Sequence, residues 1–177
     1  FGGFLGFPFS IAFLDEENLL IADPNATDGK ARSGLIVLNV RTRQQRTLSL
    51  GGNFVSALGC AVAPNRVIYA ADPSAFANSR FEEGPGGIVS VDAMTGAQTV
   101  ISKLGDFCDP ISVGVDADGG LIVCDLNGFE GRGAIFRVDA QTGEQSILSA
   151  GGIFGDPCSV FIVPHATRHE GGGHDRK

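Results

Sequence analysis

The sequence predicts an all-β protein, and two observations predict it. The chain contains an internal repeat of about fifty residues, visible as three aligned copies and the start of a fourth. Each copy contains four short runs rich in Val, Ile and Leu, separated by turn dipeptides such as Asp-Gly and Thr-Gly. Because Gly supplies the positive φ that closes a hairpin, such runs are typical of strands joined by tight turns. We therefore expect a series of four-stranded antiparallel sheets.

The first half of the repeat contains the first two predicted strands. It occurs at residues 7–23, 56–72 and 109–125 as FPFSIAFLDEENLLIAD, SALGCAVAPNRVIYAAD and DPISVGVDADGGLIVCD, which align without gaps. A fourth copy begins at Asp156 as DPCSVFIVP. The same inner pair of strands is expected in each complete copy.

The second half of the repeat contains the third and fourth predicted strands. These segments begin at Gly34, Gly87 and Gly133. In the second and third copies the turn between the two strands contains Thr-Gly, but Arg43 stands at the glycine position in the first copy. Since residues other than Gly adopt a positive φ at a cost, we expect this hairpin to be strained or differently built.

Four strands in a repeat of about 45 to 50 residues is typical of a β-propeller blade. An ordinary antiparallel sandwich is the alternative fold. Residues 1–164 are predicted to form the blades: approximately 2–50, 51–104 and 105–150 as complete four-stranded antiparallel blades, and 151–164 as one inner strand of a fourth. Three blades cannot close a ring, so we expect the ring to be closed by more chain or by oligomerisation.

Charge and hydropathy exclude two classes of partner. The chain has 20 acidic and 13 basic residues and a formal net charge of −7. Phosphate binding needs a basic face, so we expect no nucleic-acid partner. No apolar run approaches the roughly 18 residues of a membrane-spanning helix, so the chain is not expected to span a membrane. A protein partner or self-association remains.

Histidine is confined to one segment. His165, His169 and His174 all lie in residues 165–177, which we expect to be a flexible hydrophilic tail. The predicted blades therefore lack an imidazole for acid–base catalysis or zinc binding. For these blades we predict no catalytic residue, no metal site and no cofactor.

The four cysteines occupy unequal positions of the repeat, and the sequence contains no CxxC motif. They are interpreted as small buried apolar residues rather than metal or redox ligands. One alternative remains open: Cys108 and Cys158 are expected near the same ends of adjacent inner strands and could form a disulfide in an oxidising compartment.

The length of the repeat varies only in the connection between the second and third strands. In a four-stranded meander this connection lies at the same rim as the link to the next blade.

An Asp ends the second strand in each copy: Asp23, Asp72 and Asp125. A ring of these carboxylates could bind Ca²⁺ or a polar ligand. The interpretation we favour is that each Asp accepts hydrogen bonds from backbone N–H groups of its own turn.

The longest of these connections, residues 73–87, is the strongest candidate contact surface, because loops on rigid scaffolds often carry function. The candidate ligand-binding or partner-binding residues of the rim are Asp23, Asn25, Arg32, Asp72, Phe76, Arg80, Phe81, Glu82, Glu83, Asp125, Asn127, Glu130 and Arg132.

The repeat resembles the NHL-repeat and gluconolactonase-like superfamily of six-bladed β-propellers, in particular bacterial repeat proteins. The shared pattern is DPxxIxVxxDGxLxVxDxxxFxGxGxIxRVDxxTGxQxxLSxGG, and the resemblance covers residues 2–164. It implies the propeller architecture. It does not specify an activity, because propellers include hydrolases, lyases and binding modules.

In gluconolactonase-like members, the resemblance implies a divalent cation bound by Asn or Asp directly after the proline that opens an inner strand. The corresponding residues here are Phe9, Leu58, Ile111 and Cys158, and none of these side chains is an oxygen ligand. Streptogramin lyases, which are similar in their repeats, use a His and Glu pair that these blades lack.

We therefore expect a non-catalytic binding or assembly module, which is a protein-binding or structural subunit of a larger particle outside the cytoplasm, either extracellular or periplasmic. The alternative is a metal-dependent lactonase or esterase with ligands outside these blades.

Overall fold

The computed structural model describes residues 3–30, 32–77 and 86–163. In these residues the chain forms twelve strands, arranged in three separate four-stranded antiparallel sheets. The hydrogen-bonded orders are β1-β2-β3-β4, β5-β6-β7-β8 and β9-β10-β11-β12, so each sheet is a simple meander. The predicted all-β fold with three four-stranded blades is confirmed.

Blade 1 consists of β1 (Ser10–Phe13), β2 (Asn18–Asp23), β3 (Gly34–Asn39) and β4 (Gln45–Leu50). Blade 2 consists of β5 (Gly59–Val62), β6 (Ile68–Asp72), β7 (Gly87–Val91) and β8 (Gln98–Lys103). Blade 3 consists of β9 (Pro110–Val115), β10 (Leu121–Asp125), β11 (Ala134–Val138) and β12 (Gln145–Ala150).

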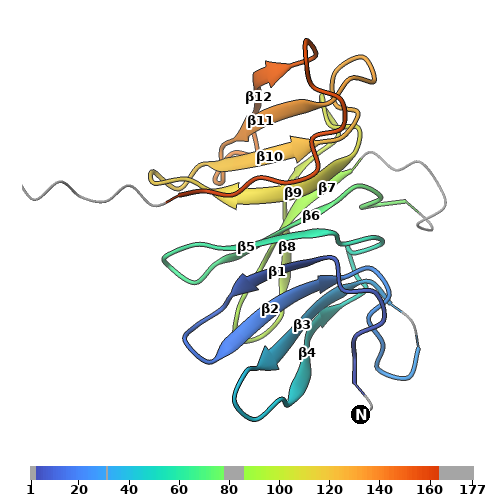
Figure 1. The fold of residues 1–177 in the computed structure, drawn as a ribbon, viewed down its shortest axis with the longest axis vertical. Coiled ribbons are helices and arrows are strands. Elements are labelled where there is room, and N and C mark those ends of the chain that lie inside the picture. Colours follow the sequence, from blue (N-terminus) through green and yellow to red (C-terminus); the bar gives the residue numbers. More distant parts are fainter. Residues whose placement is uncertain (1–2, 31, 78–85, 164–177) are drawn as a thin grey trace, which may run out of the picture.

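The blades fan out from their first strands, and β5 lies between β1 and β9 in the middle of the molecule (Figure 1). The links between blades and the β2–β3, β6–β7 and β10–β11 connections lie together at one edge, on the right in Figure 1, which we call the link rim. The tight turns lie at the opposite edge, which we call the hairpin rim.

The core has one layer between each pair of neighbouring blades, and a third buried cluster of Ile21, Ala26 and Ile36 lies on the other face of blade 1, packed by Phe4 and Leu5. In the first layer, Leu20 and Leu35 of blade 1 and Ile68 of blade 2 belong to one buried cluster. In the second layer, Phe136 of blade 3 is fully buried and packs edge-to-face on Phe107, with ring centroids 5.3 Å apart. Both faces of blade 2 are thus covered by neighbouring blades, which explains why its middle strands β6 and β7 are almost continuously apolar.

After β12 the chain returns to the middle and runs beside β9 (Figure 1). The N–H of Val160 donates to Ser112 Oγ at 3.2 Å, and Ile162 lies over Gly114, where an added Cβ would be 2.8 Å from Ile162 Cγ1. Residues 154–163 thus follow the course predicted for the inner strand of a fourth blade. They are not part of any of the three sheets, because the described chain contains no second strand of a fourth blade to pair with them.

The strained hairpin predicted at Arg43 is present. Arg43 has φ = 62°, close to the 71° and 75° of the equivalent Gly96 and Gly143. Its N–H donates to Asn39 O at 2.8 Å in the same way as in the other two hairpins. The hairpin is therefore built in the same way in all three blades, and the strain falls on the one residue that is not Gly.

Blades 2 and 3 need Gly at this position for a second reason. A Cβ added at Gly96 would overlap the carbonyl oxygen of Leu48 in blade 1, and one added at Gly143 would overlap that of Ile101 in blade 2. The described residues place no outer strand of an earlier blade against Arg43, so a side chain fits there.

We expect Arg43→Gly to raise the free energy of unfolding by about 0.5–1 kcal/mol. Gly removes the strain of a left-handed backbone at position 43, and this gain is larger than the free-energy cost of the greater freedom of Gly in the unfolded chain. Urea denaturation measures the change. Gly143→Ala is the matched control and should lower the stability by at least about 1 kcal/mol, because Ala is strained at this φ and overlaps Ile101. An Arg43→Gly variant less stable than the parent would contradict this account.

Candidate functional site

The most regular polar feature of the link rim is a buried carboxylate in each blade. Asp72 is fully buried at the end of β6. Its Oδ2 accepts hydrogen bonds from the N–H groups of Val55 at 2.8 Å and Ser56 at 2.9 Å, and its Oδ1 accepts one from Ser74 at 3.0 Å. One side chain therefore joins the chain entering the blade to the end of its second strand. We call this arrangement the aspartate clasp.

The same clasp occurs in the other two blades. Asp23 accepts from Gly6, Phe7 and Asn25, and Asp125 accepts from Cys108, Asp109 and Asn127. Both carboxylates are fully buried. The favoured interpretation, an Asp bound to its own turn, accounts for the bond from Asn25, Ser74 or Asn127 in each clasp. The bonds from the link that enters the blade were not predicted. The sequence indicates them only through the constant spacing between each Asp and the link before it.

Burial affects the protonation of two of these groups. Desolvation raises the pKa of Asp72 from 3.8 to about 6, although the N–H groups of Val55, Ser56 and Ser74 favour the ionised form. Desolvation likewise raises the pKa of Asp125. A carboxylate that is buried and already bound to three N–H groups is a structural fastening, and it presents no exposed oxygen to a ligand.

The two rim amides lie beside their clasps. Asn127 Nδ2 donates to Asp109 Oδ2 at 3.1 Å within blade 3. Asn25 Oδ1 is buried and has no hydrogen-bond partner among the described residues. Asn25 also fills the space beside Gly6, because a Cβ at Gly6 would overlap the Asn25 carbonyl. Both amides thus contribute to the packing of their own connection.

The remaining described candidates lie in three different connections of the link rim. Arg32 pairs with Asp28 at 3.9 Å between exposed side chains. Phe76 has φ = 69°, and the ammonium of Lys103 lies 5.2 Å from its ring centroid. Glu130 and Arg132 are exposed in the β10–β11 connection.

The structure brings none of these four described residues together with a rim residue of another blade through a hydrogen bond or ion pair. Arg80, Phe81, Glu82 and Glu83 lie outside the described residues.

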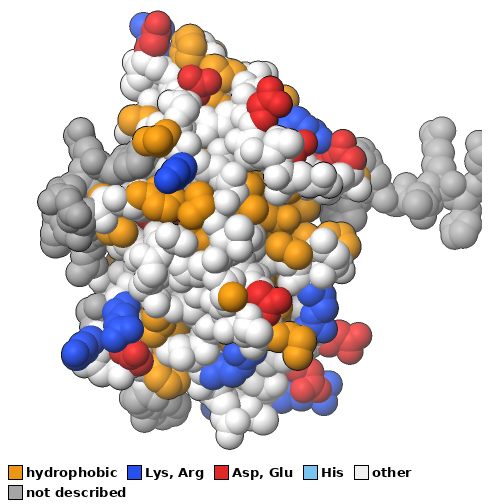
Figure 2. Space-filling model, turned by 180° about the vertical axis from the view of Figure 1, so that it is seen from behind, with side chains coloured by type: hydrophobic (Ala, Val, Ile, Leu, Met, Phe, Trp, Pro, Cys, Tyr) orange, Lys and Arg blue, Asp and Glu red, His pale blue; other side chains and the backbone are white. Residues whose placement is uncertain are grey.

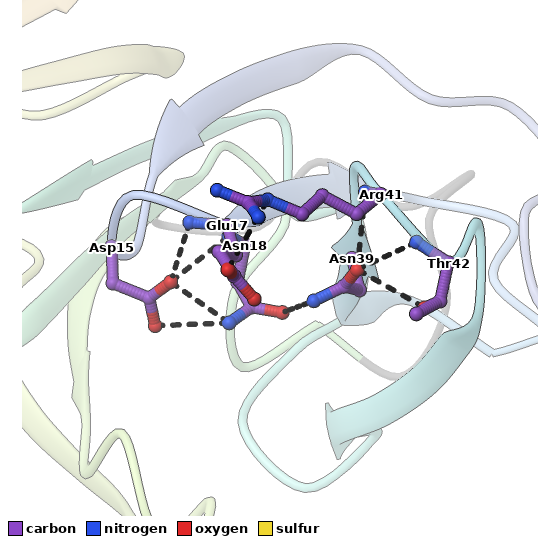
Figure 3. Close-up of polar contacts among 6 residues, drawn as sticks. All are labelled: Asp15, Glu17, Asn18, Asn39, Arg41 and Thr42. Carbon is purple, nitrogen blue, oxygen red and sulfur yellow. Dashed lines mark hydrogen bonds and ion pairs between the residues drawn. The ribbon is translucent and has the colours of Figure 1, made fainter.

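The hairpin rim carries polar networks that hold its turns. In blade 1, Asp15 Oδ1 accepts from the N–H groups of Glu17 and Asn18 (Figure 3). The network continues through Asn18 Oδ1, which accepts from Asn39 Nδ2 at 3.3 Å, and Arg41 Nε lies 3.2 Å from Glu17 (Figure 3). The backbone hydrogen bond from Glu17 is the largest cause that lowers the pKa of Asp15. These contacts fix two neighbouring turns of one blade.

The turns of the three blades surround a hollow that the sequence did not predict. It has a volume of about 980 Å³, and its apolar wall comes from the ends of the inner strands, including Phe13, Val62 and Val115, and from Ile162. Charged side chains at its edge belong to ion pairs: Arg66 lies 3.6 Å from Asp15, and Arg137 lies 2.6 Å from Asp116. The hollow arises where segments about fifty residues apart converge, so no local pattern announces it.

Three further properties concern only the described residues. No three His, Cys, Asp or Glu side chains in them are arranged to hold a metal ion. None of their secondary structure is a helix with the length and apolar character of a membrane span. No disulfide joins the four cysteines. Cys60 and Cys124 are buried as predicted, but Cys108 and Cys158 are exposed, so the prediction of small buried residues is wrong for these two. Burial raises the pKa of the Cys60 and Cys124 thiols to about 11, as expected for cysteines that act as small core residues.

No protein-family model matches the chain, and no curated protein sequence matches it. Solved structures do match. A chain in the crystal structure of a nidogen/laminin complex has a TM-score of 0.64 at 20% identity, covering 88% of this chain and 52% of that one. A gluconolactonase from Xanthomonas campestris has a TM-score of 0.64 at 14% identity, covering 88% and 50%. TolB from Acinetobacter baumannii has a TM-score of 0.58 at 18% identity, covering 83% and 33%.

At these identities the likeness shows the fold alone: the chain has the architecture of β-propeller blades. It spans about half or less of the length of the solved chains it matches. They include a chain from a protein–protein complex and an enzyme, so they do not decide between a binding and a catalytic role.

We expect Asp72→Asn to lower the free energy of unfolding by about 1–3 kcal/mol near pH 7, because an NH₂ group would face backbone N–H donors. Urea denaturation measures the loss. Asp92→Asn is the matched control: Asp92 holds an exposed turn through Oδ1, and Asn39 holds the equivalent turn of blade 1 through the same atom. This control should change stability by less than about 0.5 kcal/mol. Equal losses in the two variants would argue against the clasp.

The raised pKa of Asp72 also gives a sign for the pH dependence. Between pH 3.8 and about 6 the folded state keeps a proton that the unfolded state has lost. The contribution of Asp72 to the free energy of unfolding therefore falls as the pH rises through this window. The stability difference between the parent and Asp72→Asn should be larger at pH 4 than at pH 7. Denaturation at both pH values checks this, and a difference that grows with pH would reverse the assignment.

Proposed function

We propose that the chain is a non-catalytic protein-binding and assembly module, in which the exposed face of blade 1 packs against a second copy of the chain. One observation carries the proposal. Ile11 and Phe13 of β1 are 65% and 71% exposed, whereas Cys60 and Val113, which occupy the position of Ile11 in blades 2 and 3, are 6% and 3% exposed. On this face Ile21 and Ile36 are buried beneath Phe4 and Leu5, so the exposed apolar surface of blade 1 lies on its inner strand, at a position that is buried in the internal blade interfaces.

The strand registers establish this equivalence. Ile11 pairs with Ile21, Cys60 with Ala70, and Val113 with Val123, so the inner residue of each pair occupies the same place in its blade. Cys60 Sγ lies 3.9 Å from Leu20 O of blade 1, which shows that this face turns toward the preceding blade. The corresponding side chains of blade 1 are apolar and exposed, which is typical of a protein–protein contact. On the side of the molecule turned away from the view of Figure 1, apolar side chains of several blades also reach the surface between charged groups (Figure 2).

A glutamine at the outer edge of each blade supports the same reading. Gln98 Nε2 in blade 2 donates to Ser49 Oγ and Gly51 O of blade 1, both at 2.9 Å, and Gln145 fastens blade 3 to blade 2 in the same way. Gln45 occupies this position in blade 1, and its Oε1 accepts from Phe4 N at 2.7 Å. Blade 1 thus has, in Gln45, the glutamine that in blades 2 and 3 binds the preceding blade.

Arg43 restricts how a partner approaches this face. In the internal interfaces the equivalent Gly lies directly against the outer strand of the preceding blade. With a side chain at this position, a partner must stand further from blade 1 at the hairpin than the blades stand from one another. Contact is therefore concentrated on the inner strands, where Phe9, Ile11 and Phe13 are exposed.

The matched nidogen/laminin structure is itself a protein complex, which is consistent with a binding role for this fold. An extracellular or periplasmic location belongs to the same proposal, as does membership of the NHL-repeat branch. The alternative function, a metal-dependent lactonase or esterase, makes a different prediction about calcium.

We expect the chain to associate in sedimentation velocity experiments at micromolar concentrations, and Ile11→Asp to weaken association at least about tenfold, since a buried unpaired carboxylate costs more than about 1.4 kcal/mol. Met94→Asp is the matched control, because Met94 is exposed on the β7–β8 turn of blade 2 and not on the inner strand of blade 1, and it should leave association unchanged. A parent chain that stays folded and monomeric at all concentrations would overturn the proposal.

We expect millimolar calcium to leave the melting temperature unchanged, because a binding module of this kind needs no cation. Differential scanning fluorimetry with and without calcium measures this, with magnesium as the control for ionic strength. A calcium-specific rise in melting temperature would favour the lactonase alternative, since a ligand that binds only the folded state stabilises it.

A further inference from the structure

We propose that residues 154–163 accept an extended strand from a partner, and that this strand ends in an Asp whose carboxylate binds the N–H groups of Gly155 and Asp156. The site lies at the opposite end of the blade series from the face of blade 1, so it goes beyond the proposed function and does not depend on it.

The chain enters residues 154–163 by the same turn that leads into β5. Phe154 N donates to Gly151 O at 3.1 Å, as Phe54 N donates to Gly51 O at 3.1 Å. Pro157 then packs over Gly133 as Pro110 packs over Gly86, so closely that a Cβ on either Gly would overlap the proline ring. Residues 154–163 are therefore positioned on blade 3 as an inner strand is positioned on the blade before it.

In every complete blade, the residues that enter the inner strand offer two consecutive N–H groups to a carboxylate. The pairs are Gly6 and Phe7, Val55 and Ser56, and Cys108 and Asp109, which bind Asp23, Asp72 and Asp125 respectively. The repeat places Gly155 and Asp156 at this position. Neither N–H donates a hydrogen bond to any residue that the structure describes. A prepared donor pair thus remains available to a carboxylate from outside.

The strand edge of residues 157–163 also has a backbone N–H group without an acceptor among the described residues. Inner-strand residues Ala12, Ala61 and Gly114 pair with Leu20, Tyr69 and Ile122 of the second strands. The repeat places Phe161 at this position. Two residues later in each complete blade, the N–H of Leu14, Ala63 or Asp116 donates to the carbonyl of the first residue of the second strand or of the residue just before it. Because hydrogen-bonded positions alternate along an antiparallel pair, the N–H of Phe161 faces the place of the missing strand.

The exposed side chains agree with an unfilled strand position. Phe161 is 83% exposed and Val163 is 70% exposed. An apolar strand with unpaired backbone groups is a template for the addition of another strand, in which backbone hydrogen bonds supply affinity and alternate side chains supply specificity. Residues 154–163 therefore offer both the backbone and the apolar surface that such an addition requires.

The second strands of the three blades define the chemistry of the occupant. They end as LLIAD, IYAAD and LIVCD, with apolar residues, then a small residue, then Asp. The small residues Ala22, Ala71 and Cys124 are all fully or almost fully buried, so a small side chain precedes the Asp in every complete blade. The partner is therefore an extended peptide strand of this pattern, bound antiparallel to residues 154–163 with its Asp at Gly155 and Asp156.

The test uses the full chain and a fluorescent peptide with the sequence of residues 65–74, NRVIYAADPS, which contains β6 and its Asp. Fluorescence anisotropy should show saturable binding. The peptide in which Asp72 is replaced by Asn should bind at least about tenfold more weakly, since it loses a charge-assisted hydrogen bond. Absence of binding, or equal binding of both peptides, would overturn the proposal.

Two variants of the chain locate the binding. Phe161→Pro removes the N–H that faces the added strand and should abolish binding, whereas Met94→Asp on a distant turn should leave it unchanged. Peptide that still binds Phe161→Pro would occupy another site and would refute the assignment. In addition, hydrogen exchange at the amides of Gly155 and Asp156 should slow when the Asp peptide binds, and unchanged exchange would also refute it. Ile11→Asp separates the two proposals, because it acts on the face of blade 1 and should leave peptide binding intact.

Discussion

The aspartate clasp is the interaction on which the arrangement of the blades depends. A link that enters a blade has backbone N–H groups that no sheet satisfies, and leaving them buried without partners would cost about 1–3 kcal/mol each. Asp23, Asp72 and Asp125 satisfy these groups from the ends of the second strands. The same carboxylates bind their own turns, so one side chain sets the position of each inner strand against the rest of its blade.

This constraint changes where binding is expected. The carboxylates that made the link rim a candidate ligand ring are buried and bound to backbone. The described rim residues Arg32, Phe76, Glu130 and Arg132 lie in three different connections. The unsatisfied features lie at the two ends of the blade series instead. Blade 1 exposes apolar side chains of its inner strand, Ile11 and Phe13, and the N–H groups of Gly155 and Asp156 have no acceptor among the described residues. In blades 2 and 3 the side chains equivalent to Ile11 are buried, and in all three complete blades the equivalent N–H groups are hydrogen-bonded.

Sequence reasoning predicted the elements of the fold well, and its omissions have specific causes. The repeat and its turns predicted the three meanders, and Arg43 was recognised as strained because positive φ is a local property. The two link bonds to each Asp were not predicted, since these partners lie 16 and 17 residues earlier in the chain and hydrogen-bond geometry is not written in a periodic pattern. The hollow lined by Phe13, Val62 and Ile162 was missed for the same reason.

The sequence by itself determined the strands, the tight turns and the number of blades, because hydrophobic alternation and turn residues act within one repeat. Only the tertiary structure decided which polar groups are available and which faces are open. Cys60 and Ile11 occupy the same place in the repeat, yet one is buried and the other exposed, because only one of them has another blade packed against it. Availability depends on what packs against a residue, and no pattern within a single repeat contains that information.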